Sequence, residues 1–298
     1  MERISVCICT FKRPEMLNRL IDSLQKQESK GLFTFSITVV DNDNLGSGRA
    51  LVASIQKSSA IPIHYNIEPV QNISLARNRA LTSTEADYYA CIDDDEFADE
   101  LWLFNLYETI RTSQADGVLG PVRPFYEASP PSWLLSGKIL GREEFPTGTR
   151  IMNAKHTRSG NVIISKKIVH DNKFLFNPEY GRTGGEDYDF FKRMIDRNYR
   201  FIWCNEALVY ENTPRSRLTR SYYLRRAFLR GVVHSKNAPL LSSDTLKSLI
   251  ASMSYTVILP LVFIFRNRSL MPIMIKDCDH LGKILARFGI NVVKQRSD

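Results

Sequence analysis

The chain has 298 residues, 43% of them hydrophobic, and carries a formal net charge of +8. This length and apolar content exclude an intrinsically disordered chain and predict one large folded domain with an appendage. The first apolar run is too short and too soon interrupted for a secretory signal, so we expect a protein that stays in the cytoplasm. The five cysteines are odd in number and lack zinc-binding spacing, which favours reduced thiols.

From residue 4 to residue 95, apolar runs typical of strands alternate with helical periods, as in a parallel sheet with helices on both faces. The segments are 4–10, 14–27, 35–41, 48–58, 61–67, 73–82 and 88–93. Ligands of such sheets bind beyond the carboxyl ends of the strands. We therefore expect the polar residues that follow the strands to face one crevice, among them Thr10, Arg13, Asp41 and Asp93.

Two common nucleotide-binding motifs are absent from the sequence. No Gly-x-Gly-x-x-Gly follows the first strand, and no Gly-x-x-x-x-Gly-Lys-Ser/Thr occurs. A dinucleotide-binding fingerprint and a P-loop are thereby excluded.

Four adjacent acids end the strand-like run at 88–93: Asp93, Asp94, Asp95 and Glu96. Neighbouring ionised carboxylates repel one another unless a partner compensates them. A hard divalent ion such as Mg²⁺ or Mn²⁺ would do so and would keep positions open for substrate phosphates. The acids therefore favour a site for a metal and a pyrophosphate. The alternative is an acidic turn that caps the helix starting near Ala98.

The pattern is less regular beyond residue 103. The expected elements are a helix over 103–113, strands over 117–123 and 160–165, and a helix over 187–197. Gly184 and Gly185 stand before Glu186 and Asp187 at the start of the last helix, where glycines permit a tight loop. These acids either cap the helix or present a general base to a substrate hydroxyl, and the residues alone leave both open.

The C-terminal part of the chain is basic. Between residues 212 and 243 there are seven Lys or Arg and no acid. No helix-turn-helix and no aromatic-plus-basic strand motif accompanies this charge, so an anionic membrane surface is favoured over nucleic acid as the partner. A solvated helix face is the alternative.

An uncharged apolar run follows at residues 249–265. As a helix it would be about 25 Å long, against about 30 Å for the hydrocarbon core of a bilayer. Pro260 would kink it, and residues 270–291 are typical of an interfacial helix. Monotopic membrane attachment is favoured, with a buried hairpin and a true membrane span as alternatives.

Six short motifs occur in a fixed order: Val6-Cys7-Ile8-Cys9-Thr10-Phe11-Lys12-Arg13-Pro14, Val39-Val40-Asp41-Asn42, Asn72-Ile73-Ser74-Leu75-Ala76-Arg77-Asn78, Ile92-Asp93-Asp94-Asp95, Leu119-Gly120-Pro121-Val122 and Gly184-Gly185-Glu186-Asp187-Tyr188-Asp189-Phe190-Phe191. In this order and spacing, over residues 4–236, the chain resembles the inverting glycosyltransferases of family 2. Within that family it is most similar to the branch that builds exopolysaccharides such as succinoglycan.

The resemblance implies an α/β fold of the GT-A type, Rossmann-like, with a mainly parallel sheet and helices on both faces. A C-terminal helical extension that associates with a membrane would follow it. We expect a catalytic domain over 1–212, with a nucleotide-sugar-binding half over 1–115 and an acceptor and base half over 116–212. The basic and apolar extension would cover 213–298.

The resemblance also assigns donor-binding residues. Thr10, Asp41 and Arg77 would hold the uridine part of a nucleotide sugar, with Asp41 accepting a hydrogen bond from the base. Asp93 would meet the ribose or the metal. Arg13 and Asp94 are the other expected donor contacts.

Asp187 would be the catalytic base, and Asp95 would bind the Mg²⁺ or Mn²⁺ ion. Related enzymes often have a histidine near the strand that follows the Glu-Asp helix, whereas this chain has Tyr210 and Glu211 there. Glu211 is the expected substitute ligand. Alternatively, Asp95, phosphates and water suffice for the metal, or Glu211 is a surface acid that pairs with Arg215 or Arg217.

The expected function is that of a metal-dependent inverting glycosyltransferase at the inner face of the plasma membrane. It would move a hexose, with glucose from UDP-glucose as the expected donor, to a lipid-diphosphate-linked oligosaccharide in exopolysaccharide or other surface glycan synthesis. Two alternatives are a sugar-phosphate nucleotidyltransferase and a non-catalytic scaffold that binds membrane or glycan.

Overall fold

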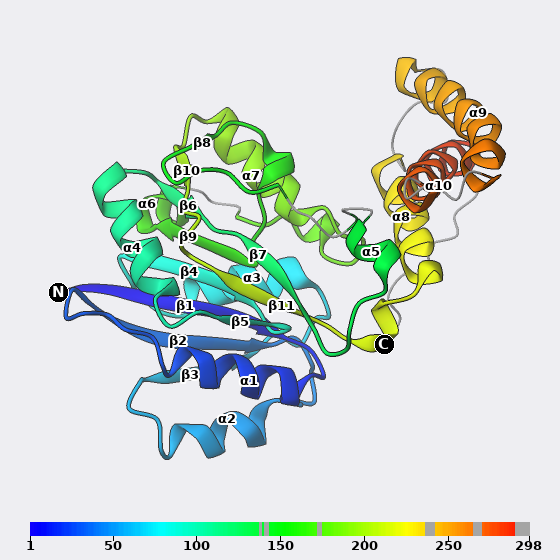
Figure 1. Ribbon diagram of the computed structural model, residues 1–298. Coiled ribbons are helices and arrows are strands. Elements are labelled where there is room, and N and C mark those ends of the chain that lie inside the picture. The colour runs from blue at the N-terminus through cyan, green and yellow to red at the C-terminus, as the bar shows by residue number, and fades with distance from the viewer. Residues whose placement is uncertain (137–138, 140–142, 172–174, 236–241, 265–269, 290–298) are drawn as a thin grey trace. The chain divides into compact units, whose positions relative to one another are not determined.

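The computed structural model describes residues 1–136, 139, 143–171, 175–235, 242–264 and 270–289 (Figure 1). The chain forms two compact units, one built from residues 1–124 and 142–212 and the other from 125–141 and 213–297. The second unit thus contains the predicted extension together with the segment 125–141, which comes from the region predicted as catalytic.

The first unit contains an eight-stranded sheet with the strand order β3-β2-β1-β4-β9-β6-β10-β8. The strands are β1 (Glu2–Thr10), β2 (Phe33–Asp41), β3 (Ile63–Ile67), β4 (Tyr88–Asp93), β6 (Gly117–Leu119), β8 (Arg150–Ile151), β9 (Asn161–Ser165) and β10 (Phe201–Trp203). The pairs of β1 with β2 and β4, of β2 with β3 and of β6 with β10 are parallel, which confirms the predicted mainly parallel sheet. In contrast, β9 runs antiparallel to β4 and β6, and β8 runs antiparallel to β10.

A smaller sheet has the order β5-β11-β7, with β5 (Glu96–Ala98), β11 (Val209–Thr213) and β7 (Val122–Tyr126). The single strand predicted over 117–123 is therefore two strands in two sheets. Pro121 lies at the break and has no backbone N–H for a ladder. Gly120 also lies there, where a Cβ atom would come within 2.3 Å of the carbonyl oxygen of Ala207.

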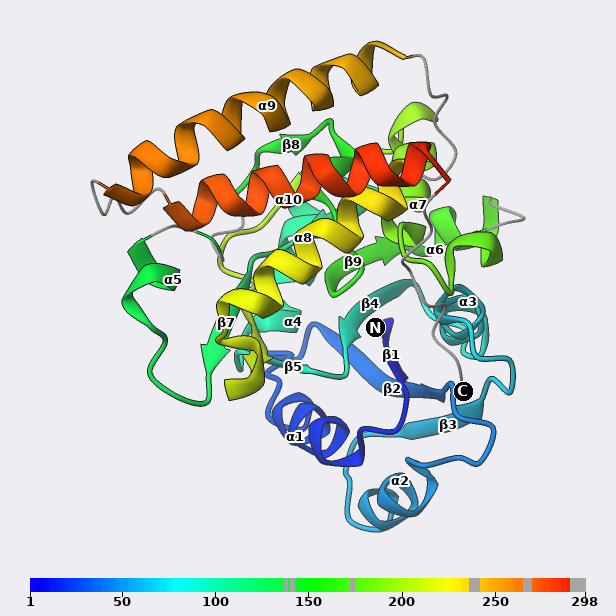
Figure 2. The same ribbon diagram turned by 90° about the vertical axis from the view of Figure 1, so that its right-hand side faces the viewer.

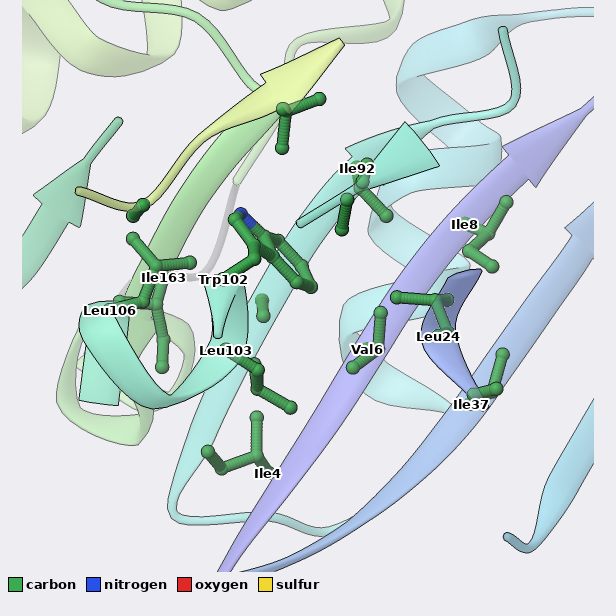
Figure 3. Close-up of a cluster of buried hydrophobic side chains, with 14 of the residues drawn as sticks. Ile4, Val6, Ile8, Leu24, Ile37, Ile92, Trp102, Leu103, Leu106 and Ile163 are labelled. Atoms are coloured by element: carbon green, nitrogen blue, oxygen red, sulfur yellow. The ribbon is translucent and has the colours of Figure 1, made fainter. Parts of the chain in front are cut away.

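Helices cover both faces of the large sheet, as predicted. The helices that share a hydrophobic cluster on one face are α1 (Pro14–Leu24), α2 (Arg49–Gln56) and α4 (Trp102–Ser113). Those on the other face are α3 (Ile73–Thr82), α6 (Lys166–Asp171) and α7 (Glu186–Asp196). Figure 3 shows part of the first cluster, in which Ile4, Val6 and Ile8 of β1 lie on the same face of the sheet as Trp102 and Leu103 of α4. Alternate residues of β1 thus serve the two cores, because successive strand side chains point to opposite faces.

The direction of β9 matters for the site. Because β9 is antiparallel to β4, its first residues lie beside the last residues of β4, and Asn161 is paired with Ile92. The fully buried Asn161 side chain secures this end of the strand. It accepts a 2.8 Å hydrogen bond from Trp102 Nε1 and donates to the carbonyls of Pro121 and Ala207 at 2.9 and 2.8 Å.

The described cysteines include all five in the chain, and all are free. The described ranges also contain three short 3₁₀ helices: η1 (Ala154–His156), η2 (Pro178–Tyr180) and η3 (Arg215–Arg217).

The second unit is helical. It comprises α5 (Ser132–Ser136), α8 (Arg220–Ser235), α9 (Ser243–Ile264) and α10 (Leu270–Arg287). In Figure 2, α10 lies alongside both α8 and α9. Trp133 of α5 packs edge-on against Tyr223 of α8, and Arg220 lies over the Trp133 ring. The predicted ends of the apolar and interfacial helices, Phe265 and Asn291, lie outside the described residues.

Two glycines let α8 and α10 approach closely. A Cβ atom at Gly231 would come within 2.0 Å of the carbonyl oxygen of Asp279, and one at Gly282 within 2.1 Å of that of Phe228. Both obstacles are backbone atoms, so a side chain cannot be accommodated by a rotamer change. Arg230 adds a 2.7 Å ion pair to Asp279 across the same contact.

Among the described residues, α9 alone is long and apolar enough to cross a membrane, judged by length and composition.

We predict that Gly282→Ala lowers the stability of the helical unit. Alanine would favour an isolated helix by about 1 kcal/mol, but the clash with the Phe228 carbonyl should cost about 1–3 kcal/mol because the helices must separate. Urea unfolding followed by circular dichroism measures the effect, with Lys276→Ala on the exposed side of α10 as the control. A Gly282→Ala variant more stable than the wild-type protein would contradict the close packing.

Candidate active site

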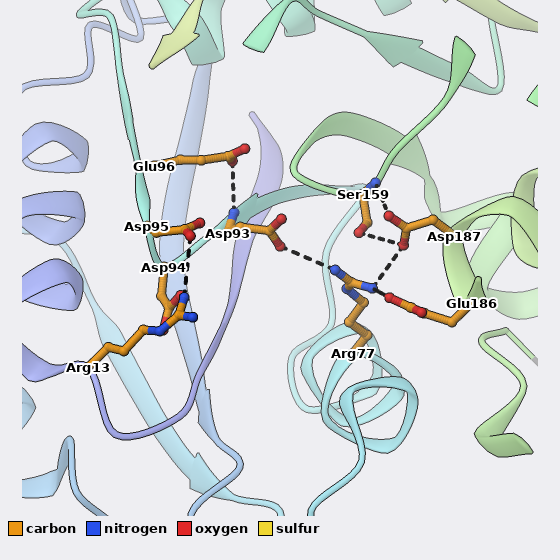
Figure 4. A network of polar contacts seen from close by, with 9 residues as sticks. All are labelled: Arg13, Arg77, Asp93, Asp94, Asp95, Glu96, Ser159, Glu186 and Asp187. Carbon is orange, nitrogen blue, oxygen red and sulfur yellow. Dashed lines mark hydrogen bonds and ion pairs between the residues drawn. The ribbon is translucent and has the colours of Figure 1, made fainter. Parts of the chain in front are cut away.

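The acids from Asp93 to Glu96 lie where β4 leaves the sheet and turns into β5 (Figure 4). Glu96 folds back so that its Oε2 accepts a 3.0 Å hydrogen bond from the backbone N–H of Asp93. Gly160, just before β9, makes room for both carboxylates: a Cβ atom there would lie 2.8 Å from Asp93 Oδ2 and 2.7 Å from Glu96 Oε1. Any residue larger than glycine at position 160 would therefore displace one of these two acids.

One group of predicted site residues surrounds Asp94. Thr10 Oγ1 donates to Asp94 Oδ2 at 2.9 Å, and Arg13 Nη1 lies 3.0 Å from Asp94 Oδ1 and 3.4 Å from Asp95 Oδ2. Burial raises the pKa of Asp94 to about 6, and it outweighs the opposing effects of Arg13 and Thr10. The structure thus brings together three predicted donor contacts and a predicted metal ligand.

Arg77 is the centre of a second group. This α3 side chain reaches Asp93 Oδ1 through Nη2 at 3.3 Å, and through Nη1 it reaches Glu186 Oε1 at 2.5 Å and Asp187 Oδ1 at 2.8 Å (Figure 4). Burial opposes the charge of Arg77, but Asp187, Asp93 and Glu186 together raise its pKa well above the usual value. One buried cation therefore joins the end of β4 to the start of α7.

The predicted tight loop before α7 is present. Gly184 and Gly185 have φ angles of 84° and 101°, in the left-handed region that favours glycine, and Gly185 is the N-cap of the helix. Glu186 and Asp187 lie in the first turn. They are thus placed favourably for the helix dipole, and both also form ion pairs with Arg77.

Ser159 is a site residue that the sequence did not reveal. Its Oγ donates to Asp187 Oδ1 at 2.7 Å, and its backbone N–H donates to Asp187 Oδ2 at 3.2 Å. Together with Arg77 it gives the Asp187 carboxylate three donors and fixes its orientation. Nothing in the local pattern around Ser159 signals this contact, which depends on the antiparallel direction of β9.

Asp41 lies at the end of β2, where it is paired with Thr10 of β1. It is fully buried and accepts hydrogen bonds from the backbone N–H groups of Asp43 and Gly48, at 3.0 and 2.7 Å, and from the Tyr65 hydroxyl at 2.8 Å. These bonds hold the loop after β2. The predicted contact with a nucleotide base would be a further hydrogen bond on this carboxylate.

Glu211 lies on β11 directly opposite Glu96 of β5. Burial raises the pKa of Glu96 well above the usual value, and the charges of Asp93, Asp95 and Glu211 raise it further. The predicted ligands Asp95 and Glu211 therefore belong to one crowded patch of oxygen donors, which suits a hard cation. Within the described ranges, however, no three His, Cys, Asp or Glu side chains are already arranged around one ion position.

The charged form of Glu186 is also disfavoured. Its pKa is raised by burial, against the effect of Arg77, and its Oε2 atom is buried with no hydrogen-bond partner in the described part of the chain. The site as a whole thus holds more negative charge than Arg13 and Arg77 neutralise.

Residues 5–172 match the family model described as "Glycosyl transferase family 2". The chain belongs to this family and is a glycosyltransferase.

Its relatives agree with this assignment. The chain is 33% identical over 239 residues to the succinoglycan biosynthesis protein ExoM of Rhizobium meliloti, covering 78% of this chain and 74% of that one. It is 24% identical over 232 residues to a GalNAc(5)-diNAcBac-PP-undecaprenol beta-1,3-glucosyltransferase of Campylobacter jejuni, covering 76% and 64%. The crystal structure of S. aureus TarS 1–349 in complex with UDP has a similar fold, with a TM-score of 0.53, 15% identity and coverage of 96% and 92%. The predicted α/β fold of the GT-A type is thereby confirmed.

We predict that Arg77→Met destabilises the protein by about 2–3 kcal/mol near neutral pH, because removing one partner of a buried ion pair leaves the other charge uncompensated. Arg79→Met is the matched control. Arg79 lies on the same helix and its side chain, 43% exposed, pairs with Glu68, so its loss should cost at most about 1 kcal/mol.

The effect of Arg77→Met should also depend on pH. Burial raises the pKa values of Asp93 and Glu186, so the folded state binds their protons more tightly than the unfolded state, and falling pH relieves their repulsion. The loss of stability in the variant should therefore shrink as the pH falls. Urea unfolding at several pH values tests this, and a pH-independent difference would contradict it.

Proposed function

We propose that the protein is an inverting glycosyltransferase that transfers a hexose, glucose in our proposal, from a UDP-sugar to a lipid-diphosphate-linked oligosaccharide in exopolysaccharide or other surface glycan synthesis. The name of the R. meliloti relative supports the pathway. That of the C. jejuni relative, a glucosyltransferase acting on a PP-undecaprenol glycan, supports the sugar and the acceptor class. Complexes of TarS with UDP and with UDP-GlcNAc support the nucleotide.

The observation that carries the proposal is the bridge through Arg77. Asp93 at the end of β4, where a donor is expected, and Asp187 at the start of α7 are both within hydrogen-bond distance of this one side chain. A base placed so near a donor site can receive a proton from an acceptor hydroxyl bound beside the donor sugar.

In the proposed reaction the acceptor oxygen attacks the anomeric carbon of the donor sugar. The bond from that carbon to the phosphate oxygen breaks, UDP leaves with the electron pair, and Asp187 takes the proton of the acceptor hydroxyl. Attack from the face opposite UDP inverts the anomeric centre. Ser159 and Arg77 would hold the Asp187 carboxylate towards the incoming hydroxyl.

The donor would be held by Thr10, Arg13, Asp41, Arg77, Asp93 and Asp94. Residues 1–115 would form the nucleotide-sugar half of the catalytic domain, and residues 116–212 the acceptor and base half. Arg13 and Arg77 are the cations of the site, and either can exchange a carboxylate for a phosphate oxygen when a donor arrives.

A Mg²⁺ or Mn²⁺ ion would be held by Asp95 and Glu211, with diphosphate oxygens and water as its other ligands. The charges of Asp93, Asp95 and Glu211 raise the pKa of Glu96, which supports this placement, because a cation bound beside them would relieve that repulsion. When bound, such an ion stabilises the negative charge that develops on a pyrophosphate leaving group.

The two alternatives considered from the sequence fit less well. Membership of family 2 favours sugar transfer over nucleotidyl transfer. The Ser159–Asp187–Arg77 arrangement favours catalysis over a purely scaffolding role, because both oxygens of the carboxylate are fixed by hydrogen bonds. We place the enzyme in the cytoplasm, peripherally attached to the inner face of the plasma membrane.

We predict that Asp187→Asn reduces transfer by at least about a thousandfold while UDP binding changes little, because the amide keeps the shape but cannot accept the proton. Product formation is measured with UDP-glucose and membrane lipid extract, and UDP binding by calorimetry. Asp189→Asn is the matched control: Asp189 lies on the same helix but pairs with Arg193, so transfer should persist. Full activity of Asp187→Asn would refute the role of Asp187.

We further predict that Mn²⁺ tightens UDP binding and that Asp95→Ala removes this effect, weakening binding at least about tenfold in its presence. Without metal the variant should bind UDP at least as tightly as the wild-type protein, because a negative charge that repels the diphosphate has been lost. Glu100→Ala, at an exposed acid just beyond β5, is the control. Equal UDP affinity with and without Mn²⁺ in the wild-type protein would argue against the metal.

A further inference from the structure

Helix α9 buries polar residues and exposes apolar ones, which is the reverse of a helix in a water-soluble domain. The residues that it buries are polar: Thr245, Ser248 and Ser252. The residues that it exposes are mostly large and apolar: Leu246, Leu249, Ile250, Met253, Val257, Ile258, Leu261, Phe263 and Ile264. A helix on the surface of a soluble domain normally turns its apolar stripe inward.

Four of the exposed residues form a straight line along α9. Leu246, Met253, Val257 and Ile264 are spaced by 7, 4 and 7 residues, which at 3.6 residues per turn places them on one side of the helix. Their exposed fractions are 60%, 70%, 71% and 69%. This stripe is about 27 Å long. Apolar residues scattered singly over a surface would not form a continuous line of that length.

The polar side of α9 is fixed to α10. Ser252 Oγ donates a 2.7 Å hydrogen bond to Asp277 Oδ1, and both residues are buried. Rotating α9 to turn its apolar stripe inward would break this bond and leave the Asp277 carboxylate buried without it, which is costly. The contact between α9 and α10 therefore keeps the apolar stripe on the outside of the unit.

The unit also carries a strong positive charge. Residues 213–235, 242–264 and 270–289 contain ten Lys or Arg and three Asp. Among them Arg220, Arg225 and Arg226 of α8 are exposed. A unit that combines basic residues with an exposed apolar helix face complements a bilayer with anionic lipid headgroups.

We propose that the apolar stripe of α9 docks on an anionic lipid bilayer and lies flat in the interfacial region of one leaflet. The length of α9 would also permit a crossing. However, α9 is attached along its polar side to α10, which carries Asp277, Asp279 and Lys283, and a crossing would draw these charges towards the hydrocarbon core at a large cost. This docking deepens the proposed function and rests on it only for the choice of the inner leaflet.

Flotation of the full-length protein with vesicles tests the docking. The protein should float with vesicles of phosphatidylcholine and phosphatidylglycerol, and less with phosphatidylcholine alone. Met253→Glu/Val257→Glu should reduce vesicle binding at least tenfold without lowering thermal stability, because both side chains are exposed. Met152→Glu is the matched control in the first unit, where Met152 is 63% exposed. Undiminished vesicle binding by the double variant would overturn the proposal.

Depth measurements distinguish a flat helix from a crossing one. Nitroxide labels would be attached to Leu246→Cys, Met253→Cys, Val257→Cys and Ile264→Cys, with the unsubstituted protein as the control for labelling of the native cysteines. Equal, shallow immersion of all four labels is the expected result. Immersion that changes steadily along the helix would show a crossing and overturn the proposal, as would contact of the labels with a second copy of the chain instead of lipid.

UDP binding by the same variants separates this proposal from the proposed function. The double variant should bind UDP like the wild-type protein. Vesicle binding in a protein that binds no nucleotide would leave the docking intact and remove the catalytic proposal.

Discussion

The attraction between Arg77 and three carboxylates is the interaction on which the site depends. Asp93 ends a central strand, whereas Glu186 and Asp187 begin a helix more than ninety residues later. Burial raises the pKa of Asp93 and of Glu186, so their charged forms need a partner. A single guanidinium, with its fork of donors, can satisfy several such groups at once, which a lysine ammonium does less well. The acids still carry more negative charge than Arg77 neutralises. A bound metal ion would relieve the repulsion among them, because it adds positive charge.

The two units meet different physical demands. The first buries two apolar layers on either side of a sheet and gathers its charges at the carboxyl ends of the strands. The second keeps large apolar side chains on its surface and uses serines, glycines and a buried aspartate for internal contacts. Small residues at the crossing of α8 and α10 let the backbones approach, as glycine does in tightly packed helix pairs. This construction fits the docking that we propose for α9.

The sequence predicted the elements up to β4 because each carries a clear periodic pattern and a start signal, such as Pro14 at the first turn of α1. It also located the acids and the glycine loop before α7. It did not predict that β9 runs antiparallel, since a short apolar strand carries no sign of its direction. For that reason Ser159 was missed, as was the sharing of Arg77 between Asp93 and Asp187. Such partners are separated by many residues in the chain and become neighbours only through the sheet order.

The antiparallel pairing of β4 with β9 has a consequence for how such enzymes diversify. The register fixes the end of one strand and the start of the other, so Asp93 and Ser159 keep their positions whatever chain connects β7 to β8. Lengthening a surface connection costs little, about 0.6 kcal/mol for each doubling. If residues 116–212 bind the acceptor, as proposed above, insertion or exchange in this stretch changes the acceptor specificity while Asp93 and Ser159 remain side by side.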